Sequence, residues 1–268
     1  MISRLLEDLG LFTGLKKQHD DEALFFIHLN EWLLRQAGGA WDHPGAFKYL
    51  LQHREVRSMA AEYLRYIMST PRVTSFLGWK GYLRHRSPQN VDFPWGWKDP
   101  RNTFTLPLWL DIFPAARVIH IYRNGIDVAD SLMVREGKTF MKRRPLAHHS
   151  LKRLMYVFRP KRGGFADSLR CASLEGGFAL WEEYLVEARR HVLDLGNRAM
   201  AIRYEDFLSN PHDTLRILVD FCGLPTGNDS IERAAAQVRT SRAYAYKNKP
   251  ELQDFSRKFA SRLQLYGY

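Results

Sequence analysis

Apolar residues in the first quarter of the chain recur at the three-to-four-residue spacing of one helix face. This spacing predicts helices over residues 3–9, 22–36 and 55–68, the last of them ending near Pro71. The segment 22–36 shows the pattern most clearly, with a broad apolar face made of Leu24, Phe25, Ile27, Leu29, Trp32 and Leu33.

The pattern changes after Pro71. Residues 71–94 mix glycine, proline and aromatic residues, which favours loops over regular elements. A short strand is predicted over 93–98, where Asp99-Pro100 ends it. A helix is predicted over 103–112, ending at Pro114.

Strands and helices then alternate. Residues 117–122 (RVIHIY) are almost continuously apolar, as in a parallel strand covered on both faces. An Asn-Gly turn follows, then a helix over about 127–136. A long helix is predicted over 168–195, with Gly176-Gly177 as its weak point, followed by a strand over 199–203. Further helices are predicted over 212–222 and 250–264, which together indicate an α/β fold with a parallel sheet.

Composition excludes several protein classes. Of the 268 residues, 45% are hydrophobic and 26% are charged, which is typical of globular proteins and not of disordered, collagen-like or coiled-coil chains. No apolar run reaches the roughly 18 residues of a membrane span, and Glu7 and Asp8 interrupt the apolar N-terminus, unlike a signal peptide. Cys171 and Cys222 fit neither a disulfide scaffold nor a zinc site, which favours a reducing cytoplasm.

A formal net charge of +11 points to an anionic partner: nucleic acid, a membrane surface, a glycan or a phosphate-rich cofactor. Residues 137–166 contain no acidic residue. Two interpretations are open for this stretch: a solvated surface segment, or an electropositive lid or track for the acceptor. Its basic residues are Lys138, Lys142, Arg143, Arg144, Lys152, Arg153, Arg159, Lys161 and Arg162.

Polar side chains follow each of the predicted strands. Lys98 ends the first, Arg123 ends the second, and Tyr204 ends the third. Ser131 and Arg135 are four residues apart and share one face of the helix after Arg123. Ligands of α/β proteins bind beyond the carboxyl ends of the strands, and an arginine fork with a hydroxyl group suits a phosphate.

Two of these segments resemble the sulfotransferase family. WGWKDPRNTFTLPLWLDIFPAARVIHIYRNGIDVADSLMVRE looks like its second-strand lysine and 3′-phosphate-binding segment, and AIRYEDFLSNPHDTLRILVDFCGLP looks like its downstream strand and helix. The K-D-P triplet and the R…S…R spacing are closest to the bacterial and tyrosylprotein sulfotransferase branch. The resemblance implies a single domain over 1–268: a three-layer, P-loop-type parallel sheet flanked by helices, with 137–166 as a basic lid or insertion.

The resemblance also implies a reaction. The donor would be 3′-phosphoadenosine 5′-phosphosulfate, and its sulfuryl group would pass in line to a hydroxyl or amine of a glycan, lipid or protein. Arg123, Ser131 and Arg135 would hold the 3′-phosphate, Lys98 would approach the sulfuryl group, and Tyr204 would lie near the nucleotide. No metal is expected. The acceptor would be anionic or sugar-containing, for a cytoplasmic enzyme that also docks peripherally at a membrane.

The proton of the acceptor needs a base. In this branch the base is a glutamate shortly after the first helix, so Glu22 is the candidate and His19 its rival. Glu22 belongs to the acidic cluster Asp20-Asp21-Glu22. The competing interpretation is that this cluster only caps the next helix. Arg242, Lys247 and Lys249 fall where the family places a late cofactor-contacting loop, although a solvated loop is an equal alternative.

One family feature does not occur in this sequence. There is no G-x-x-R-S-G-T-type loop after an apolar strand to cradle the 5′-phosphosulfate. We expect the natural protein to start about 15–25 residues upstream, the length of a strand, a loop and a leader. The alternative is a non-catalytic relative that binds a nucleotide or an anionic glycan. A P-loop kinase is disfavoured because G-x-x-x-x-G-K-[ST] is absent, and specific nucleic-acid binding because no recognised module is present.

Overall fold

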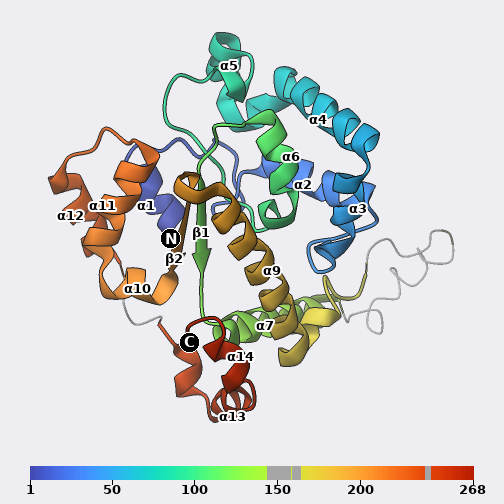
Figure 1. The fold of residues 1–268 in the computed structure, drawn as a ribbon, viewed down its shortest axis with the longest axis vertical. Coiled ribbons are helices and arrows are strands. Elements are labelled where there is room, and N and C mark those ends of the chain that lie inside the picture. Colours follow the sequence, from blue (N-terminus) through green and yellow to red (C-terminus); the bar gives the residue numbers. More distant parts are fainter. Residues whose placement is uncertain (144–157, 159–163, 239–242) are drawn as a thin grey trace. The chain divides into compact units, whose positions relative to one another are not determined.

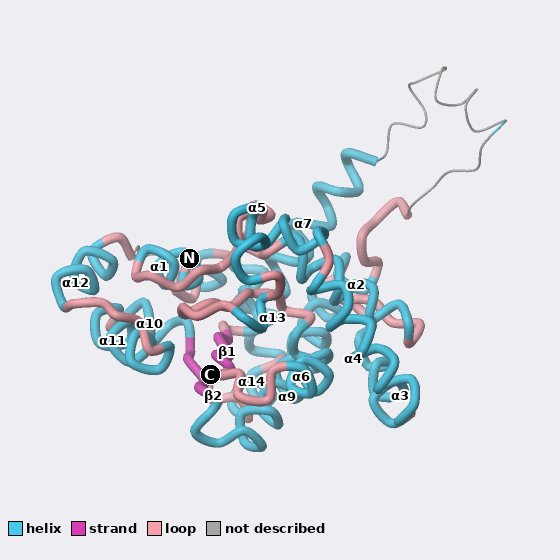
Figure 2. Tube along the Cα trace, turned by 90° about the horizontal axis from the view of Figure 1, so that it is seen from above, coloured by secondary structure: helices cyan, strands magenta, loops and turns pink. Residues whose placement is uncertain are grey.

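The computed structural model describes residues 1–143, 158, 164–238 and 243–268. The chain divides into two compact units. The first unit comprises 1–121 and 187–240, and the second comprises 122–186 and 241–268. The described residues are rich in helix and contain two strands, β1 (Val118–Tyr122) and β2 (Ala199–Arg203), which pair in a small parallel sheet (Figure 1 and Figure 2).

Helices make up most of the first unit. Its core gathers around α2 and α6, which both contact α3, and it is built from large apolar side chains such as Phe26, Phe47, Phe76 and Trp109. The helices of this unit are α1 (Ile2–Asp8), α2 (Leu24–Gln36), α3 (Phe47–Gln52), α4 (Arg54–Ser69), α5 (Thr74–His85), α6 (Asn102–Ile112), α10 (Tyr204–Ser209), α11 (Pro211–Cys222) and α12 (Asn228–Ala236).

Several predicted elements are confirmed. The strands over 117–122 and 199–203 are β1 and β2, and the helices over 3–9, 22–36, 55–68, 103–112 and 212–222 are α1, α2, α4, α6 and α11. Gly223 ends α11 in the left-handed region, with φ of 66°, as a C-terminal glycine does. The α/β class therefore holds for the described residues, while the three-layer sheet stays a prediction.

The loop predicted over 71–94 is wrong in its central part, where α5 forms. Gly78 interrupts this helix with φ of 73° and ψ of 171°, so the segment is two short helical pieces joined by a kink. Gly78 and Gly81 lie inside the segment, and two glycines within four residues are more typical of a loop than of a helix. The strand predicted over 93–98 is also wrong: Trp95 makes only an isolated parallel bridge to Phe12.

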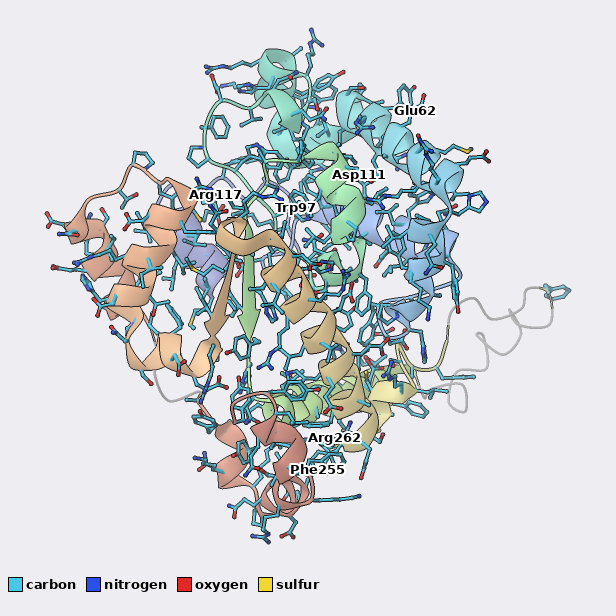
Figure 3. The ribbon with its side chains drawn as sticks, in the orientation of Figure 1. Glu62, Trp97, Asp111, Arg117, Phe255 and Arg262 are labelled. Atoms are coloured by element: carbon cyan, nitrogen blue, oxygen red, sulfur yellow. The ribbon has the colours of Figure 1, made fainter. Side chains whose placement is uncertain are left out.

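Trp97 nevertheless fixes this extended segment. Its ring stacks on that of Phe26 with centroids 4.0 Å apart, and its Nε1 donates to Asn102 Oδ1 at 3.0 Å. Trp97 thus lies in the aromatic interior of the first unit (Figure 3). The backbone at the neighbouring Lys98 is held in place as a result, while its side chain stays 44% exposed.

The second unit is a smaller helical cluster. It contains α7 (Gly125–Arg143), α13 (Pro250–Lys258) and α14 (Ala260–Gln264), and most of α9 (Leu174–Leu195). Ile126, Phe178 and Phe255 are among its core residues, and Arg262 pairs with Glu182 (Figure 3). The helix predicted over 250–264 divides at Phe259 into α13 and α14, and the helix predicted from 168 begins at Leu174.

The glycine pair in α9 is a packing device rather than a weak point. A Cβ on Gly176 would lie 1.9 Å from the carbonyl oxygen of Arg170, and one on Gly177 would lie 3.1 Å from Cα of Ala129. The two glycines therefore let α9 approach its neighbours more closely than any side chain would permit.

Replacing Gly176→Ala should destabilise the protein by about 1–3 kcal/mol, although alanine favours helices, because the methyl group overlaps a backbone oxygen. Gly137→Ala is the matched control: Gly137 lies inside α7, where a Cβ meets nothing within 4 Å. That change should stabilise by about 1 kcal/mol. Denaturant unfolding of both variants tests the assignment, and equal stabilisation by the two alanines would contradict it.

Candidate active site

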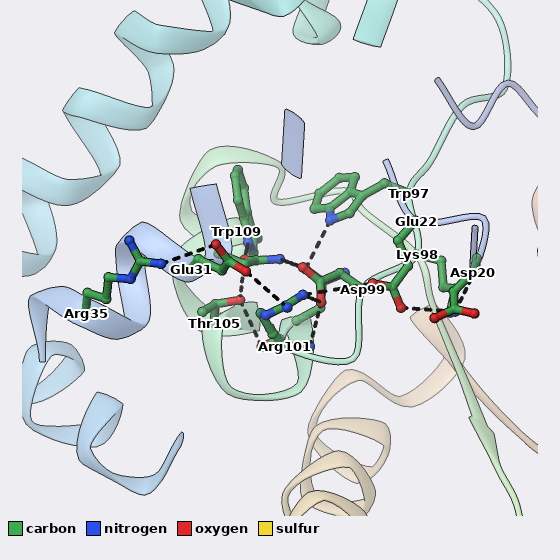
Figure 4. A network of polar contacts seen from close by, with 12 residues as sticks. Asp20, Glu22, Glu31, Arg35, Trp97, Lys98, Asp99, Arg101, Thr105 and Trp109 are labelled. Atoms are coloured by element: carbon green, nitrogen blue, oxygen red, sulfur yellow. Dashed lines mark hydrogen bonds and ion pairs between the residues drawn. The ribbon is translucent and has the colours of Figure 1, made fainter. Parts of the chain in front are cut away.

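Glu22 and Lys98 form an ion pair in the first unit. Glu22 lies in the loop before α2, and Lys98 lies in the extended segment before α6. Lys98 Nζ is 3.1 Å from Glu22 Oε1 and donates to the backbone oxygen of Asp20 at 3.0 Å (Figure 4). The fold thus joins two sequence-predicted site residues that are far apart in the chain.

The two partners differ in their access to solvent. The Glu22 side chain is 12% exposed and that of Lys98 is 44% exposed. Burial raises the pKa of Glu22 above its ordinary value, and nearby Asp99 raises it further, while Lys98 and Arg101 oppose both. Glu22 is therefore a stronger base than a solvated glutamate, and the ammonium group of Lys98 reaches the surface.

His19 has a different environment. Its side chain is 86% exposed, and its Nε2 lies 3.3 Å from Asp20 Oδ2. Asp21, next in the chain, has φ of 62° and pairs with Arg4 at 2.6 Å. Within the acidic cluster it is thus Glu22 whose carboxylate the structure places on Lys98.

A buried polar network lies behind this pair. Asp99 is fully buried as a side chain, and its Oδ1 accepts from the backbone nitrogen of Arg101 at 2.9 Å and from Arg101 Nη1 at 3.0 Å. Asn30 Nδ2 donates to Asp99 Oδ2 at 2.8 Å. Sequence reasoning assigned no role to Asn30 or Arg101. The signal that could have found Asn30 is one amide on the apolar face of α2, beside Leu33 and Leu34.

Arg123 lies in the second unit, directly after β1. Its Nη2 donates to Asp127 Oδ2 at 2.9 Å, and its backbone oxygen accepts from Trp181 Nε1 at 3.0 Å. Asp127 is in the first turn of α7, as predicted, and is almost fully buried. A Cβ on Gly125 would clash with the Trp181 ring, so glycine is required for this approach.

Asp127 also fixes the late loop. Its two oxygens accept from the backbone nitrogens of Tyr246, at 2.8 Å, and Ala245, at 3.3 Å. Lys249 Nζ reaches Asp130 Oδ2 on the same helix at 2.8 Å. Arg123 and Lys249 are therefore both held against the first turns of α7, although they are far apart in the sequence.

Other predicted residues of the second unit lie on α7 or outside the described residues. Ser131 and Arg135 are exposed on this helix, and Arg135 Nε is 3.6 Å from Glu136 Oε1. Lys138 and Lys142 are exposed further along it. Arg242 is outside the described residues, as are most of the basic residues of 137–166.

Tyr204 belongs to the first unit, together with Glu22 and Lys98. It is the first residue of α10, immediately after β2, and is half-buried. Lys247 lies in the short helical turn Ala245–Asn248 of the second unit, where its Nζ is 4.5 Å from the Tyr244 ring centroid.

Comparison with known families decides the membership of this chain. The sequence profile described as the sulfotransferase family matches residues 30–228, about three quarters of the chain. The chain belongs to the sulfotransferase family. The match includes Lys98, Arg123, Ser131, Arg135 and Tyr204, whereas Glu22, His19, Arg242 and Lys249 lie outside it. Comparisons with curated proteins and with solved structures gave no match.

Two further features are absent from the described residues. None of the described helices is both long and apolar enough to cross a bilayer. In the same part of the chain, no group of three or more His, Cys, Asp or Glu side chains is arranged to hold a metal ion.

Glu22→Gln should stabilise the protein at neutral pH. Because its pKa is raised, folded Glu22 binds its proton more tightly than the unfolded chain does, so stability falls as pH rises from about 4.3 through the folded pKa. Glutamine removes this loss. The melting temperature should rise at pH 7, by about 2–4 °C for each kcal/mol gained, and should change little at low pH.

Asp21→Asn provides a control of opposite sign. Burial raises the pKa of Asp21, but the hydrogen bond and the charge of Arg4, together with the N-terminal ammonium group and Lys17, outweigh burial and lower it. Ionised Asp21 therefore stabilises the fold above its unfolded pKa. Asparagine also tolerates the positive φ of this position. The control should therefore lose stability at pH 7. A Glu22→Gln variant that is less stable than wild type at pH 7 would refute the burial argument.

Proposed function

We propose that this chain transfers a sulfuryl group from 3′-phosphoadenosine 5′-phosphosulfate to a hydroxyl or amine of a glycan, lipid or protein. The observation that carries the proposal is the Glu22–Lys98 pair, a buried base beside an exposed cation, in a chain of the sulfotransferase family. Sulfuryl transfer needs both groups, one to accept a proton and one to balance developing negative charge.

In this mechanism the acceptor oxygen or nitrogen forms a bond to sulfur while the bond from sulfur to the bridging oxygen of the donor breaks. The electron pair of the broken bond leaves with 3′-phosphoadenosine 5′-phosphate, and the acceptor proton passes to Glu22. Lys98 turns from Glu22 to the sulfuryl group, which its exposure permits. This turn frees Oε1 of Glu22 at the moment when the carboxylate is needed as a base.

The donor also carries a 3′-phosphate. We assign its binding to Arg123, Ser131 and Arg135, with Lys249 as an additional cation from the late loop. An arginine gives a phosphate two parallel hydrogen bonds, and serine adds a third. The contacts of Asp127 support this assignment, since this carboxylate holds both Arg123 and the backbone of the late loop. Tyr204 would contact the nucleotide.

The finer features are also proposals. The K-D-P triplet and the R…S…R spacing favour the bacterial and tyrosylprotein branch and, with it, a single domain with a three-layer P-loop-type sheet. Cys171 and Cys222 favour a cytoplasmic enzyme, and the basic stretch 137–166 favours peripheral docking at membranes. The basic stretch 137–166 favours an anionic or sugar-containing acceptor.

A second candidate is a non-catalytic relative that binds the nucleotide or an anionic glycan. The observation in its favour is the stretch 137–166, which is basic and contains no acidic residue, and so suits an anionic ligand without any catalytic step.

Calorimetric titration with 3′-phosphoadenosine 5′-phosphate tests the donor assignment. We expect wild type to bind and Arg123→Ala to bind about tenfold to a hundredfold more weakly, because a charge-assisted hydrogen-bond pair to the phosphate is lost. Arg190→Ala is the matched control, since Arg190 is an exposed arginine paired with Glu187 and Asp194. Equal loss in both variants, or no binding by folded wild type, would refute the assignment.

A further inference from the structure

Arg101 is surrounded by carboxylates from separate segments of the first unit. Its Nη1 lies 3.0 Å from Asp99 Oδ1 and 3.9 Å from Glu22 Oε2, and its Nη2 lies 3.3 Å from Glu31 Oε1 (Figure 4). Glu22 precedes α2, Glu31 lies within α2, and Asp99 belongs to the turn before α6. One guanidinium group therefore connects the proposed base to two other elements.

The guanidinium group is held from the core side. Asp99, its closest partner, accepts a hydrogen bond from Asn30, which is itself completely buried. Within the described residues Asn30 also donates to Asn102 and accepts from Thr105 and Trp109, each at 2.8 Å, so that its amide is fully satisfied. A buried network with all its hydrogen bonds made is rigid, and Asp99, a member of this network, fixes the position of the Arg101 guanidinium group.

Glu22 thus has a cation at each oxygen. Lys98 is 3.1 Å from Oε1 and is 44% exposed, whereas Arg101 is 3.9 Å from Oε2 and is 16% exposed. The lysine has a flexible stem and reaches solvent, but the arginine is fixed. When Lys98 turns to the sulfuryl group, Arg101 is the cation that stays beside Glu22.

We propose that Arg101 is a positioning residue: it holds the carboxylate of Glu22 in place and keeps that carboxylate ionised while Lys98 contacts the sulfuryl group of the donor. This inference rests on the proposed role of Glu22 as the base. A guanidinium group suits the task because its planar fork spans several carboxylates and stays charged in a buried setting.

Direct titration of Glu22 separates this role from a merely structural one. The probe is ¹³C NMR of protein labelled at the glutamate side-chain carboxyl, with the Glu22 signal assigned by its loss in Glu22→Gln. The charged groups that act on Glu22 are Lys98, Asp99 and Arg101, and all but the substituted one are kept in each variant. This readout requires a folded chain but no catalytic activity.

Arg101→Gln should raise the proton affinity of Glu22 about tenfold or more, because a cation next to a partly buried carboxylate is lost. Arg35→Gln is the matched control: Arg35 pairs with Glu31 at 3.4 Å at the outer end of the same network. The titration of Glu22 in this control should match that of wild type.

An Arg101→Gln variant that folds and titrates at Glu22 like wild type would overturn the proposal. If that variant does not fold, Arg101→Lys decides: lysine keeps the charge but cannot span the same carboxylates, so the proton affinity of Glu22 should rise by a smaller factor, and no change would overturn the proposal. A failure of the proposed function is recognised separately, since folded wild type would then release no 3′-phosphoadenosine 5′-phosphate from the donor when an acceptor is present, whatever the titration shows.

Discussion

The hydrogen bond from Asn30 to the buried carboxylate of Asp99 is the contact on which the candidate site depends. It ties α2 to the turn before α6, and both proposed catalytic side chains flank these elements: Glu22 just before α2, and Lys98 just before Asp99. Burial raises the pKa of Asp99, which Arg101 and Asn30 oppose. Leaving a buried ion without its partner typically costs about 3–5 kcal/mol, so the members of this network depend on one another.

At Glu22, base strength and folding stability oppose each other. Desolvation raises the pKa of Glu22 and makes it a better base, yet the same desolvation makes its ionised form unfavourable in the folded chain. The core around it offsets this cost. Phe26 and Trp97 stack beside the site, and Trp109 joins the aromatic core to the polar network through its hydrogen bond to Asn30. The packing of these aromatic side chains thus offsets the cost of burying the ionised carboxylate of Glu22.

Elements with strong periodicity or clear end signals could be predicted from the sequence. Neighbouring residues alone determine three such features: the apolar face of α2, the apolar run of β1, and the ends of α11 at Pro211 and Gly223. The sequence of α5 carries signals against a helix, because Gly78 and Gly81 lie inside it and Gly78 breaks its backbone. Its formation depends on tertiary contacts that no local pattern reports.

The candidate residues show the same division. Resemblance to the family selected Lys98 and Arg123, and it also selected Glu22, as a glutamate shortly after the first helix. The support for these residues came from elsewhere: Asn30 and Asp127 act through partners about 70 and 120 positions away, respectively. A buried polar residue on an apolar helix face is a visible anomaly, but the sequence does not tell which distant group satisfies it.

Turnover of 3′-phosphoadenosine 5′-phosphosulfate tests the central claim most directly. The release of 3′-phosphoadenosine 5′-phosphate would be followed with a phenol, a disaccharide and a lipid hydroxyl as acceptors. We predict acceptor-dependent release by wild type, a loss of about a hundredfold or more in Lys98→Ala and Glu22→Gln, and near wild-type rates in His19→Ala. Full activity in Glu22→Gln together with an inactive His19→Ala would contradict the account. A wild-type protein that binds 3′-phosphoadenosine 5′-phosphate but never forms it from the donor would contradict the account as well.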